Sequence, residues 1–325
     1  MHIHFPRRHL PAKFLTPSSL RLAAAALLTL ASSPPGRSCA CGCGIYDVGT
    51  SSMMPTTKGG MLSLDYAYQD QNKNWSGTSP APAADNDDKD IRTSFYTLVY
   101  QQVFNRAWSL RAELPYAVRH FETTGGPTGD DIVDLNYRGI GDARLEGIYT
   151  TQDRSFGVTF GAKLPTGSYT LNDTYGDIDR DTEIGSGSTD ILLGAFKRFA
   201  LTNDLRWNEF AQVLFDSPVL TRDQYRPGSE ADAAAGVYYD GWFLGGLRVS
   251  PIGEVKVSMR GRDTGANASS PAASGYTRLI LAPGLEVDGH RFRISAELGV
   301  TVFQRITGDQ LTAPLSVSVA TAWIF

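Results

Sequence analysis

The chain has 325 residues, of which 30 are basic and 34 are acidic, so its formal net charge at neutral pH is −4. This acidic balance argues against a nucleic acid as a partner. The sequence contains no run of about 18 or more apolar residues, which excludes a membrane-spanning helix. The length suits one large domain or two smaller ones.

The amino terminus has the pattern of an export signal. Basic residues are followed by an apolar run of Ala and Leu over residues 22–31 and then by small residues, which is the order of a secretory signal peptide. We predict residues 1–40 as the signal peptide, with cleavage after Ala40 or, alternatively, near Ala31. Its removal takes away five basic residues and no acidic one, which leaves 25 basic and 34 acidic residues and a net charge of −9.

All three cysteines lie together, at Cys39, Cys41 and Cys43, and we predict residues 41–59 as a Cys- and Gly-rich periplasmic lead-in. If cleavage falls before Cys41, then Cys41 and Cys43 remain as a pair that could form a strained disulfide or hold a soft metal. The alternatives are a lipid-modified amino-terminal cysteine and a flexible, partly removed leader. Two thiolates alone are an incomplete metal site.

From residue 60 onward, apolar and polar residues alternate in short segments. Leu62, Leu64 and Tyr66 alternate with Ser63 and Asp65, and the same period of two recurs along the rest of the chain. Such alternation is typical of strands with one apolar and one polar face. We therefore predict an all-β fold, in which residues 60–325 form a single closed antiparallel transmembrane β-barrel with its apolar faces toward lipid.

The strand count follows from the connections, because barrels of this kind alternate short periplasmic turns with long outer loops. We expect long loops at residues 70–90, 125–137, 166–185, 217–231, 263–275 and 305–312. The Asp240-Gly241 pair is a hairpin signal, but a turn there gives thirteen strands. We therefore predict one strand over residues 234–250 with a bulge at Asp240-Gly241, a turn at 251–253, and about twelve strands in total.

The last segment, Leu315–Phe325, alternates in the same way and ends on an aromatic residue. It resembles the terminal strand of bacterial outer-membrane barrels, which the barrel-assembly machinery of that membrane reads. The resemblance implies export to the outer membrane of a Gram-negative bacterium, contact with outer-membrane lipid, and an assembly signal at Trp323 and Phe325. The small residues that alternate with the apolar ones, Ser316, Ser318, Ala320 and Ala322, should then face the lumen.

Two further stretches carry a family resemblance. Residues 163–167 with 185–190, and residues 261–263 with 282–285, resemble the strand–loop–strand pattern of the outer-membrane transporters associated with phenol meta-cleavage pathways. The resemblance implies an outer-membrane barrel that passes small aromatic or hydrophobic molecules. The cysteine cluster and the Asp-rich loop are not part of that pattern, so the substrate is not carried over.

Charged residues on the polar faces of the strands are predicted to point into the lumen. The residues predicted to set selectivity there are Arg111, Glu113, Asp142, Arg144, Glu146, Lys163, Arg260, Arg293 and Glu297, with Asp65, Asp190 and Lys256 as further inward candidates. Facing charges of opposite sign set a field across a water-filled pore. The alternative is a narrow lumen that salt-bridged side chains fill, without flow.

Other chemistry has weaker signals. Carboxylates alternate at Asp177, Asp179, Asp181 and Glu183, which suggests either a calcium site, since hard cations take several oxygen ligands, or a solvated acidic loop. A barrel hydrolase needs Ser and His close together at its outer rim. Beyond the signal peptide the chain has only His120 and His290, without a nucleophile motif, so we predict no enzyme and no cofactor.

The sequence therefore predicts an outer-membrane channel or transporter-like barrel that passes a small-molecule solute through a charged lumen. The alternative is a structural or partner-docking barrel whose cysteine motif binds a metal or a periplasmic redox partner.

Overall fold

The computed structural model describes residues 59–125, 131–172 and 178–325. None of the helical segments in these ranges is long and apolar enough to cross a membrane. The strands are β1 (Gly59–Gln71), β2 (Lys73–Gly77), β3 (Ser79–Pro80), β4 (Asp88–Val103), β5 (Trp108–Gly125), β6 (Asp131–Ile140), β7 (Ala143–Thr150), β8 (Phe156–Leu164), β9 (Ser188–Ala200), β10 (Trp207–Thr221), β11 (Glu230–Tyr239), β12 (Trp242–Leu244), β13 (Leu247–Arg260), β14 (Tyr276–Asp288), β15 (Phe292–Thr312) and β16 (Leu315–Ile324), with short 3-10 turns η1 (Ala83–Asp85) and η2 (Pro271–Ala273).

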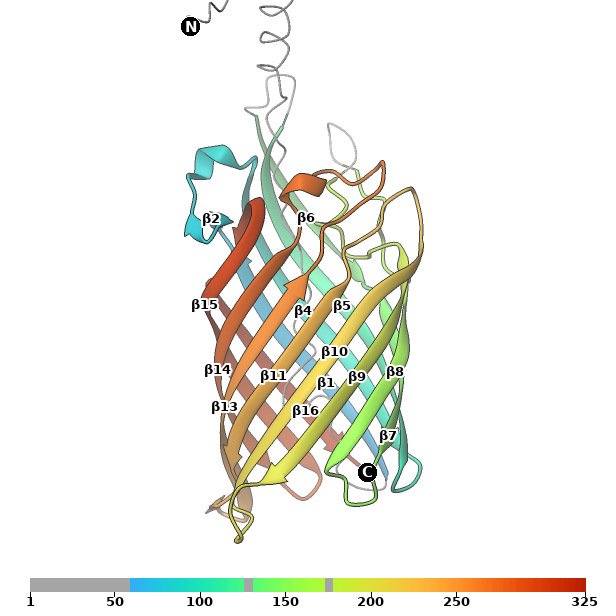
Figure 1. Cartoon of the computed structure of the whole chain (residues 1–325), viewed down its shortest axis with the longest axis vertical. Coiled ribbons are helices and arrows are strands. Elements are labelled where there is room, and N and C mark those ends of the chain that lie inside the picture. The colour runs from blue at the N-terminus through green and yellow to red at the C-terminus, as the bar shows by residue number, and fades with distance from the viewer. Residues whose placement is uncertain (1–58, 126–130, 173–177) are drawn as a thin grey trace, which may run out of the picture. The chain divides into compact units, whose positions relative to one another are not determined.

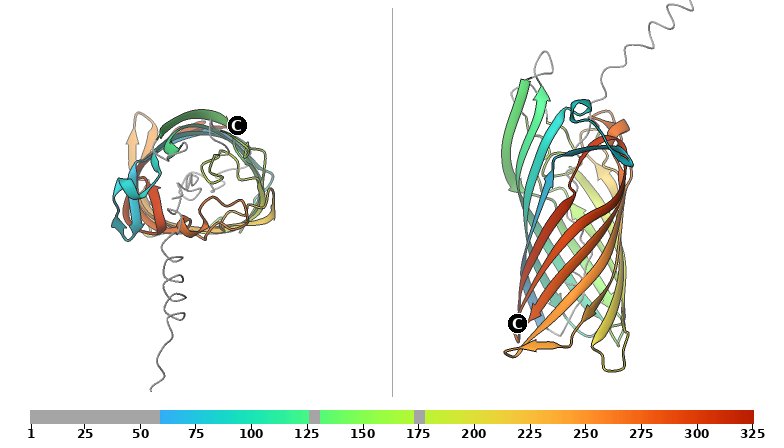
Figure 2. Two further views of the ribbon diagram at one scale, coloured as in Figure 1. Left: turned by 90° about the horizontal axis from the view of Figure 1, so that it is seen from above. Right: turned by 90° about the vertical axis from the view of Figure 1, so that its left-hand side faces the viewer.

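Twelve of these strands close into one antiparallel barrel (Figures 1 and 2). Their order around the wall is β1, β4, β5, β7, β8, β9, β10, β11, β13, β14, β15 and β16, and β16 pairs back with β1. Closure matters because lipid offers no hydrogen bonds to an open strand edge. The predicted all-β, twelve-stranded transmembrane barrel is confirmed.

The two ends of the barrel sequence meet at the closing seam. Gly60 N donates to Phe325 O at 2.8 Å, and Phe325 N donates to Gly60 O at 2.9 Å. The Trp323 and Phe325 side chains are exposed on the outside of the wall, whereas Ala322 is buried on the inner face, as the alternation predicts. The short turns at residues 104–107, 151–155 and 289–291 separate strands that run to and from this same end, which we take as the periplasmic end.

The turn between the eighth and ninth barrel strands was predicted in the wrong place. β11 ends at Tyr239, the Asp240-Gly241 pair separates it from β12, and the chain turns at Gly245-Gly246 before β13 begins at Leu247. The segment expected as a turn, 251–253, lies inside β13, where Pro251 is opposite Leu285. The total remains twelve because this turn is displaced along the chain and no turn is added or lost.

Two predicted outer loops are built of strand. β6 covers much of the predicted loop 125–137 and pairs with the outer half of β5. β7 pairs with the periplasmic half of β5. β6 and β7 therefore follow one another along the same edge of β5, with Gly141 and Asp142 between them. β15 runs through the predicted loop 305–312, and β2 pairs with its outer part. Cross-strand hydrogen bonds of neighbouring hairpins outweigh the loop-like composition of these segments.

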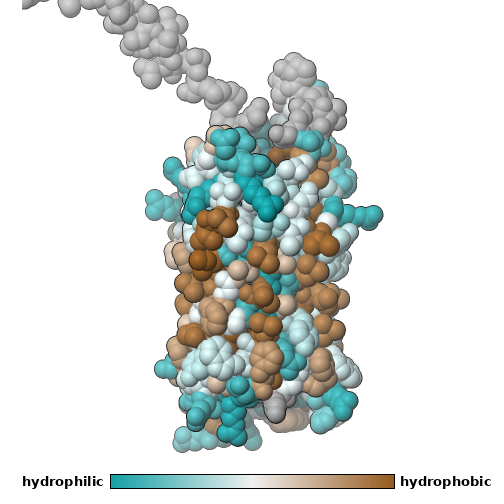
Figure 3. Space-filling view, turned by 90° about the vertical axis from the view of Figure 1, so that its right-hand side faces the viewer, coloured by the Kyte–Doolittle hydropathy of each residue, from teal (hydrophilic) through white to brown (hydrophobic). Residues whose placement is uncertain are grey.

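An apolar band surrounds the outside of the barrel. Figure 3 shows this band between two hydrophilic ends on the face that it displays. Exposed leucines such as Leu62, Leu64 and Leu98 belong to it. Near the periplasmic end, the Trp108 and Tyr149 rings lie 5.2 Å apart in an edge-to-face contact, as is usual for aromatic residues at a membrane interface.

The inside of the barrel is partly apolar, which the alternation alone did not predict. Ile148, Phe196, Phe210, Leu214 and Ala234 form a buried cluster. They occupy the same strand faces as the charged lumenal residues, because each is separated from one of them by an even number of positions. This cluster fills part of the lumen and narrows the space that is left for solutes.

Candidate lumen site

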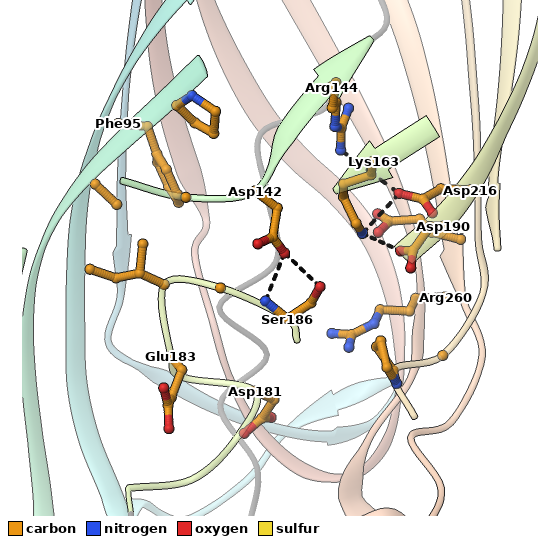
Figure 4. A pocket seen from close by; sticks show the side chains of 18 of the residues that line it. Phe95, Asp142, Arg144, Lys163, Asp181, Glu183, Ser186, Asp190, Asp216 and Arg260 are labelled. Atoms are coloured by element: carbon orange, nitrogen blue, oxygen red, sulfur yellow. Dashed lines mark hydrogen bonds and ion pairs between the residues drawn. The ribbon is translucent and has the colours of Figure 1, made fainter. Parts of the chain in front are cut away.

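A cavity of about 210 Å³ lies inside the barrel, between the strand wall and the segment 178–187. Phe95, Pro115 and Ala117 supply apolar surface from β4 and β5, and Ile184 adds to it from the segment. Lys163, Asp190 and Asp216 face them from β8, β9 and β10, as Figure 4 shows for Phe95 and the charged group. The cavity therefore has an apolar patch opposite a charged group, and Glu113 and Arg119 also line it from β5.

The charged group is organised around Lys163. Its Nζ contacts the Asp190 carboxylate and lies 3.1 Å from Asp216 Oδ2. Arg144 Nη2 lies 3.9 Å from the same Asp216 oxygen. The Lys163 side chain is 15% exposed and that of Asp190 only 2%, so water screens this group weakly. Register explains the contact, because Lys163 and Asp190 are directly opposite on neighbouring strands.

Asp142 holds the segment 178–187 in place rather than facing the cavity as a free charge. Its Oδ1 accepts a hydrogen bond from Gly167 N at 3.0 Å. Its Oδ2 accepts from Ser186 N at 2.8 Å and from Ser186 Oγ at 2.6 Å (Figure 4). A Cβ atom on Gly185 would lie 2.5 Å from the backbone of Gly167, so only glycine permits the two ends of the loop to approach this closely.

Two arginines also stabilise this inward segment. Arg119 is buried, donates to Thr93 Oγ1 at 2.9 Å and contacts the Thr182 carbonyl. The Arg180 guanidinium lies 4.9 Å from the ring centres of both Tyr169 and Tyr225, a geometry that favours cation–π attraction. Seen from above, the yellow-green part of the chain that contains this segment lies inside the ring of strands (Figure 2).

The segment carries one carboxyl group with a strongly altered acidity. Burial raises the pKa of Asp181 to about 8, and the nearby Asp263 carboxylate acts in the same direction, whereas Arg260 opposes the shift. Asp181 is therefore largely protonated at neutral pH, which lowers the charge cost of placing it inside the barrel.

Further ion pairs lie elsewhere in the lumen. Arg111 contacts Glu113, and Arg111 is directly opposite Glu146 on β7. Arg293 Nε lies 3.4 Å from Glu286 Oε1 near the periplasmic end. Lys256 contacts Glu297 and lies 3.4 Å from Glu254 Oε1. Arg111 and Arg293 both line a small space of about 10 Å³.

The structure brings together five of the nine predicted selectivity residues. Those lining the cavity are Glu113, Asp142, Arg144, Lys163 and Arg260. Arg111, Arg293 and Glu297 belong to the other lumenal ion pairs, and Glu146 is directly opposite Arg111 on the neighbouring strand. Sequence reasoning missed Asp216, Asp232, Arg119 and Arg180 as cavity residues. Asp216 is four positions from Gln212 on the same strand, so the alternation of faces could have placed it in the lumen. Arg180 could not have been placed in this way, because its loop has no periodic pattern.

The residues predicted to bind metal lie partly outside the described part of the chain. Cys41, Cys43 and Asp177 lie outside the described residues. The Asp179 main-chain carbonyl accepts a hydrogen bond from Thr182 N at 2.9 Å, and Glu183 Oε1 accepts from Leu171 N at 3.1 Å. Within ranges 59–125, 131–172 and 178–325, no three His, Cys, Asp or Glu side chains are arranged to hold a metal ion.

A closed, twelve-stranded antiparallel barrel with an apolar outer band and a charged interior is the fold of an outer-membrane β-barrel protein. Among solved structures, the chain is similar to an outer-membrane channel from Pseudomonas putida F1, with 11% identity, a TM-score of 0.64, and coverage of 86% of this chain and 100% of that chain. This likeness shows the fold alone.

Two other solved structures are more distant. The β-domain of the Bordetella autotransporter BrkA has 12% identity and a TM-score of 0.48, with coverage of 83% of this chain and 100% of that one. The Pseudomonas putida toluene transporter TodX has 9% identity and a TM-score of 0.40, with coverage of 83% and 90%. No protein-family model and no curated protein matches the sequence.

Proposed function

We propose that this chain is an outer-membrane channel that admits small solutes through its charged lumen. The observation that carries the proposal is the cavity of about 210 Å³ inside a closed barrel, between an apolar patch and the Lys163 group. A barrel that served only as a structural or docking element would need no such two-sided space in its interior. No catalytic step is part of the proposal.

The size of the cavity limits the solute. An apolar cavity of about 150 Å³ accommodates benzene, and the cavity here measures about 210 Å³. A solute of roughly one ring therefore fits without moving the segment 178–187. A solute with an apolar face and a charged or polar group would match both sides, because Phe95, Pro115 and Ala117 offer apolar contacts and the Lys163 group offers hydrogen bonds.

The charge of the cavity favours cations. Eight carboxyl groups and five cationic side chains line it. Acidic side chains therefore outnumber basic ones around the cavity. A lumen lined in this way raises the local concentration of cations and lowers that of anions.

Swelling of proteoliposomes in sugars of graded size tests the proposal. We expect arabinose to enter and the trisaccharide raffinose to be excluded. Ala117→Trp should reduce arabinose entry, because Ala117 is buried and lines the cavity. Ala211→Trp is the matched control, because Ala211 is exposed on the opposite face of its strand. Equal entry through both variants would show that the solute does not pass the cavity.

Export and assembly belong to the same proposal. We infer that residues 1–40 are removed as a signal peptide, that the barrel-assembly machinery recognises Trp323 and Phe325, and that outer-membrane lipid contacts the apolar band. The exposed position of both aromatic side chains at the closing seam supports this. Deleting Phe325 should impair insertion into the outer membrane, and normal insertion would count against the signal. Mass spectrometry of the mature amino terminus would show whether Cys41 and Cys43 remain.

A further inference from the structure

A short hairpin at the periplasmic end carries the most exposed large apolar side chains of the described residues. Leu244 is 75% exposed and Phe243 is 71% exposed, and Trp242 precedes them. β12 pairs with the start of β13, from Trp242 opposite Val249 to Leu244 opposite Leu247. Figure 2 shows this hairpin in light orange, projecting beyond the ring of strands in the left view and lying at the same end of the barrel as the C-terminus in the right view.

The sequence specifies the turn at the tip of this hairpin. Gly245 and Gly246 both have positive φ, at 57° and 83°. Two successive residues with positive φ are what a two-residue hairpin turn of type I′ requires, and glycine adopts them without strain. No heavy atom lies within 4 Å of a Cβ built on either glycine, so within the described chain nothing covers the tip.

The base of the hairpin is fixed, so its direction is set by the fold. Asp240 N donates to Arg206 O at 2.7 Å, which ties the base to the neighbouring turn. The Asp240 carboxylate accepts from Ser250 Oγ at 2.6 Å and lies 3.6 Å from Arg248 Nη1. These polar contacts attach the base of the hairpin to the barrel, whereas its tip is apolar.

Aromatic side chains connect the hairpin with the lipid-facing wall. The Trp207 and Tyr239 rings lie 5.0 Å apart, and the Tyr239 and Trp242 rings lie 5.9 Å apart. Trp207 is exposed on the outer face of β10. The adjoining turn adds two more exposed apolar side chains, Leu201 and Leu205. The apolar surface of the hairpin is therefore continuous with the surface that meets lipid.

We propose that the β12–β13 hairpin is a membrane anchor that inserts Trp242, Phe243 and Leu244 into the periplasmic leaflet of the outer membrane. Tryptophan is favoured at this depth because its ring is apolar and its N–H can still reach water. The turn at residues 151–155, by contrast, is Thr-Gln-Asp-Arg-Ser and carries no large apolar side chain. The anchor acts on one side of the barrel, over β10 to β13.

A fluorescent label tests the anchor. Cys39, Cys41 and Cys43 are changed to Ser, and an environment-sensitive dye is attached to Leu244→Cys in lipid nanodiscs that hold one barrel each. Gln152→Cys in the polar turn is the matched control. We expect a blue-shifted emission at position 244, quenching by lipids that carry a spin label near the headgroup, and severalfold weaker quenching by aqueous iodide than at position 152.

Equal quenching by iodide at both positions would overturn the proposal, because the tip would then lie in water. Protection that appears in discs with two barrels and is lost in discs with one would also overturn it, and would assign the tip to contact with a second copy. Heat-modifiable migration of both labelled proteins on gels shows that each barrel is folded, so a folding defect cannot imitate either result.

Discussion

The charged group of the cavity makes a quantitative prediction for Lys163→Gln. Even at the full screening of bulk water, a unit charge about 4 Å from a passing ion changes the energy of that ion by about 1 kcal/mol, and salt at 0.1 M lowers this to about 0.7 kcal/mol. The substitution removes one positive charge, so it stabilises cations and destabilises anions by that amount each. The difference of about 1.4 kcal/mol corresponds to about a tenfold rise in the cation-to-anion permeability ratio.

The assay is the reversal potential of the purified protein in a planar bilayer with a potassium chloride gradient. Lys197→Gln is the matched control, because Lys197 is exposed on the outside of β9. Since Asp190 and Asp216 stay behind without their lysine, we also expect the free energy of unfolding to fall by up to about 3 kcal/mol. A folded Lys163→Gln protein with the same reversal potential as Lys197→Gln would refute the placement of Lys163 on the ion path.

Three further predictions address the inward segment and the wall. Asp142→Ala removes three hydrogen bonds to Gly167 and Ser186, so trypsin should cut after Arg180 faster than in the Asp153→Ala control; equal rates would contradict the role of Asp142. The raised pKa of Asp181, about 8, means that the docked segment binds a proton that the released segment loses near pH 4. Docking is therefore strongest below pH 4 and weakens as the pH rises to about 8. Hydrogen exchange of residues 178–187, corrected for intrinsic rates, should increase over that range, and Asp181→Asn should abolish the trend; an unchanged trend in that variant would assign it to another group. Gly161→Ala places a Cβ atom 2.3 Å from Leu145 O and should lower stability to urea by about 1–3 kcal/mol, whereas Gly253→Ala, with nothing within 4 Å, should be nearly neutral; similar losses for both would mean that strand spacing does not set the cost.

The sequence specifies the barrel because two rules act on every strand. Alternation assigns each residue to lipid or lumen, and the alternation of short and long connections fixes the number of strands. These rules placed Leu315–Phe325 correctly beside β1, with Trp323 outside and Ala322 inside. They failed at residues 251–253, because Pro251 and Gly253 look like a turn but lie in β13 between two neighbouring strands.

Only part of the cavity lining could be predicted from the sequence. Alternation finds residues on strand faces, such as Lys163 and Glu113, because their direction follows from their position. It cannot find Arg180, whose place depends on how a loop without periodicity folds back between Tyr169 and Tyr225. It also cannot show that Asp142 is occupied by hydrogen bonds to the loop instead of facing solutes. Contacts between segments distant in sequence decide both.

The same limit applies to the interior apolar cluster. Phe210 and Leu214 stand on the inner face of β10, where a polar residue is the usual choice for a barrel, and both are almost completely buried. Their partners Ile148 and Phe196 come from β7 and β9. Only the closed barrel brings these side chains together, so the narrowing of the lumen could not be derived from any one strand.

The most direct test of the central claim is the conductance of the purified protein in a planar lipid bilayer. A channel with this charged cavity should produce discrete current steps, prefer cations at neutral pH, and lose conductance in Ala117→Trp but not in Ala211→Trp. A bilayer that stays closed under all salt and pH conditions, with the barrel folded and inserted, would contradict the channel and favour a structural or partner-docking barrel.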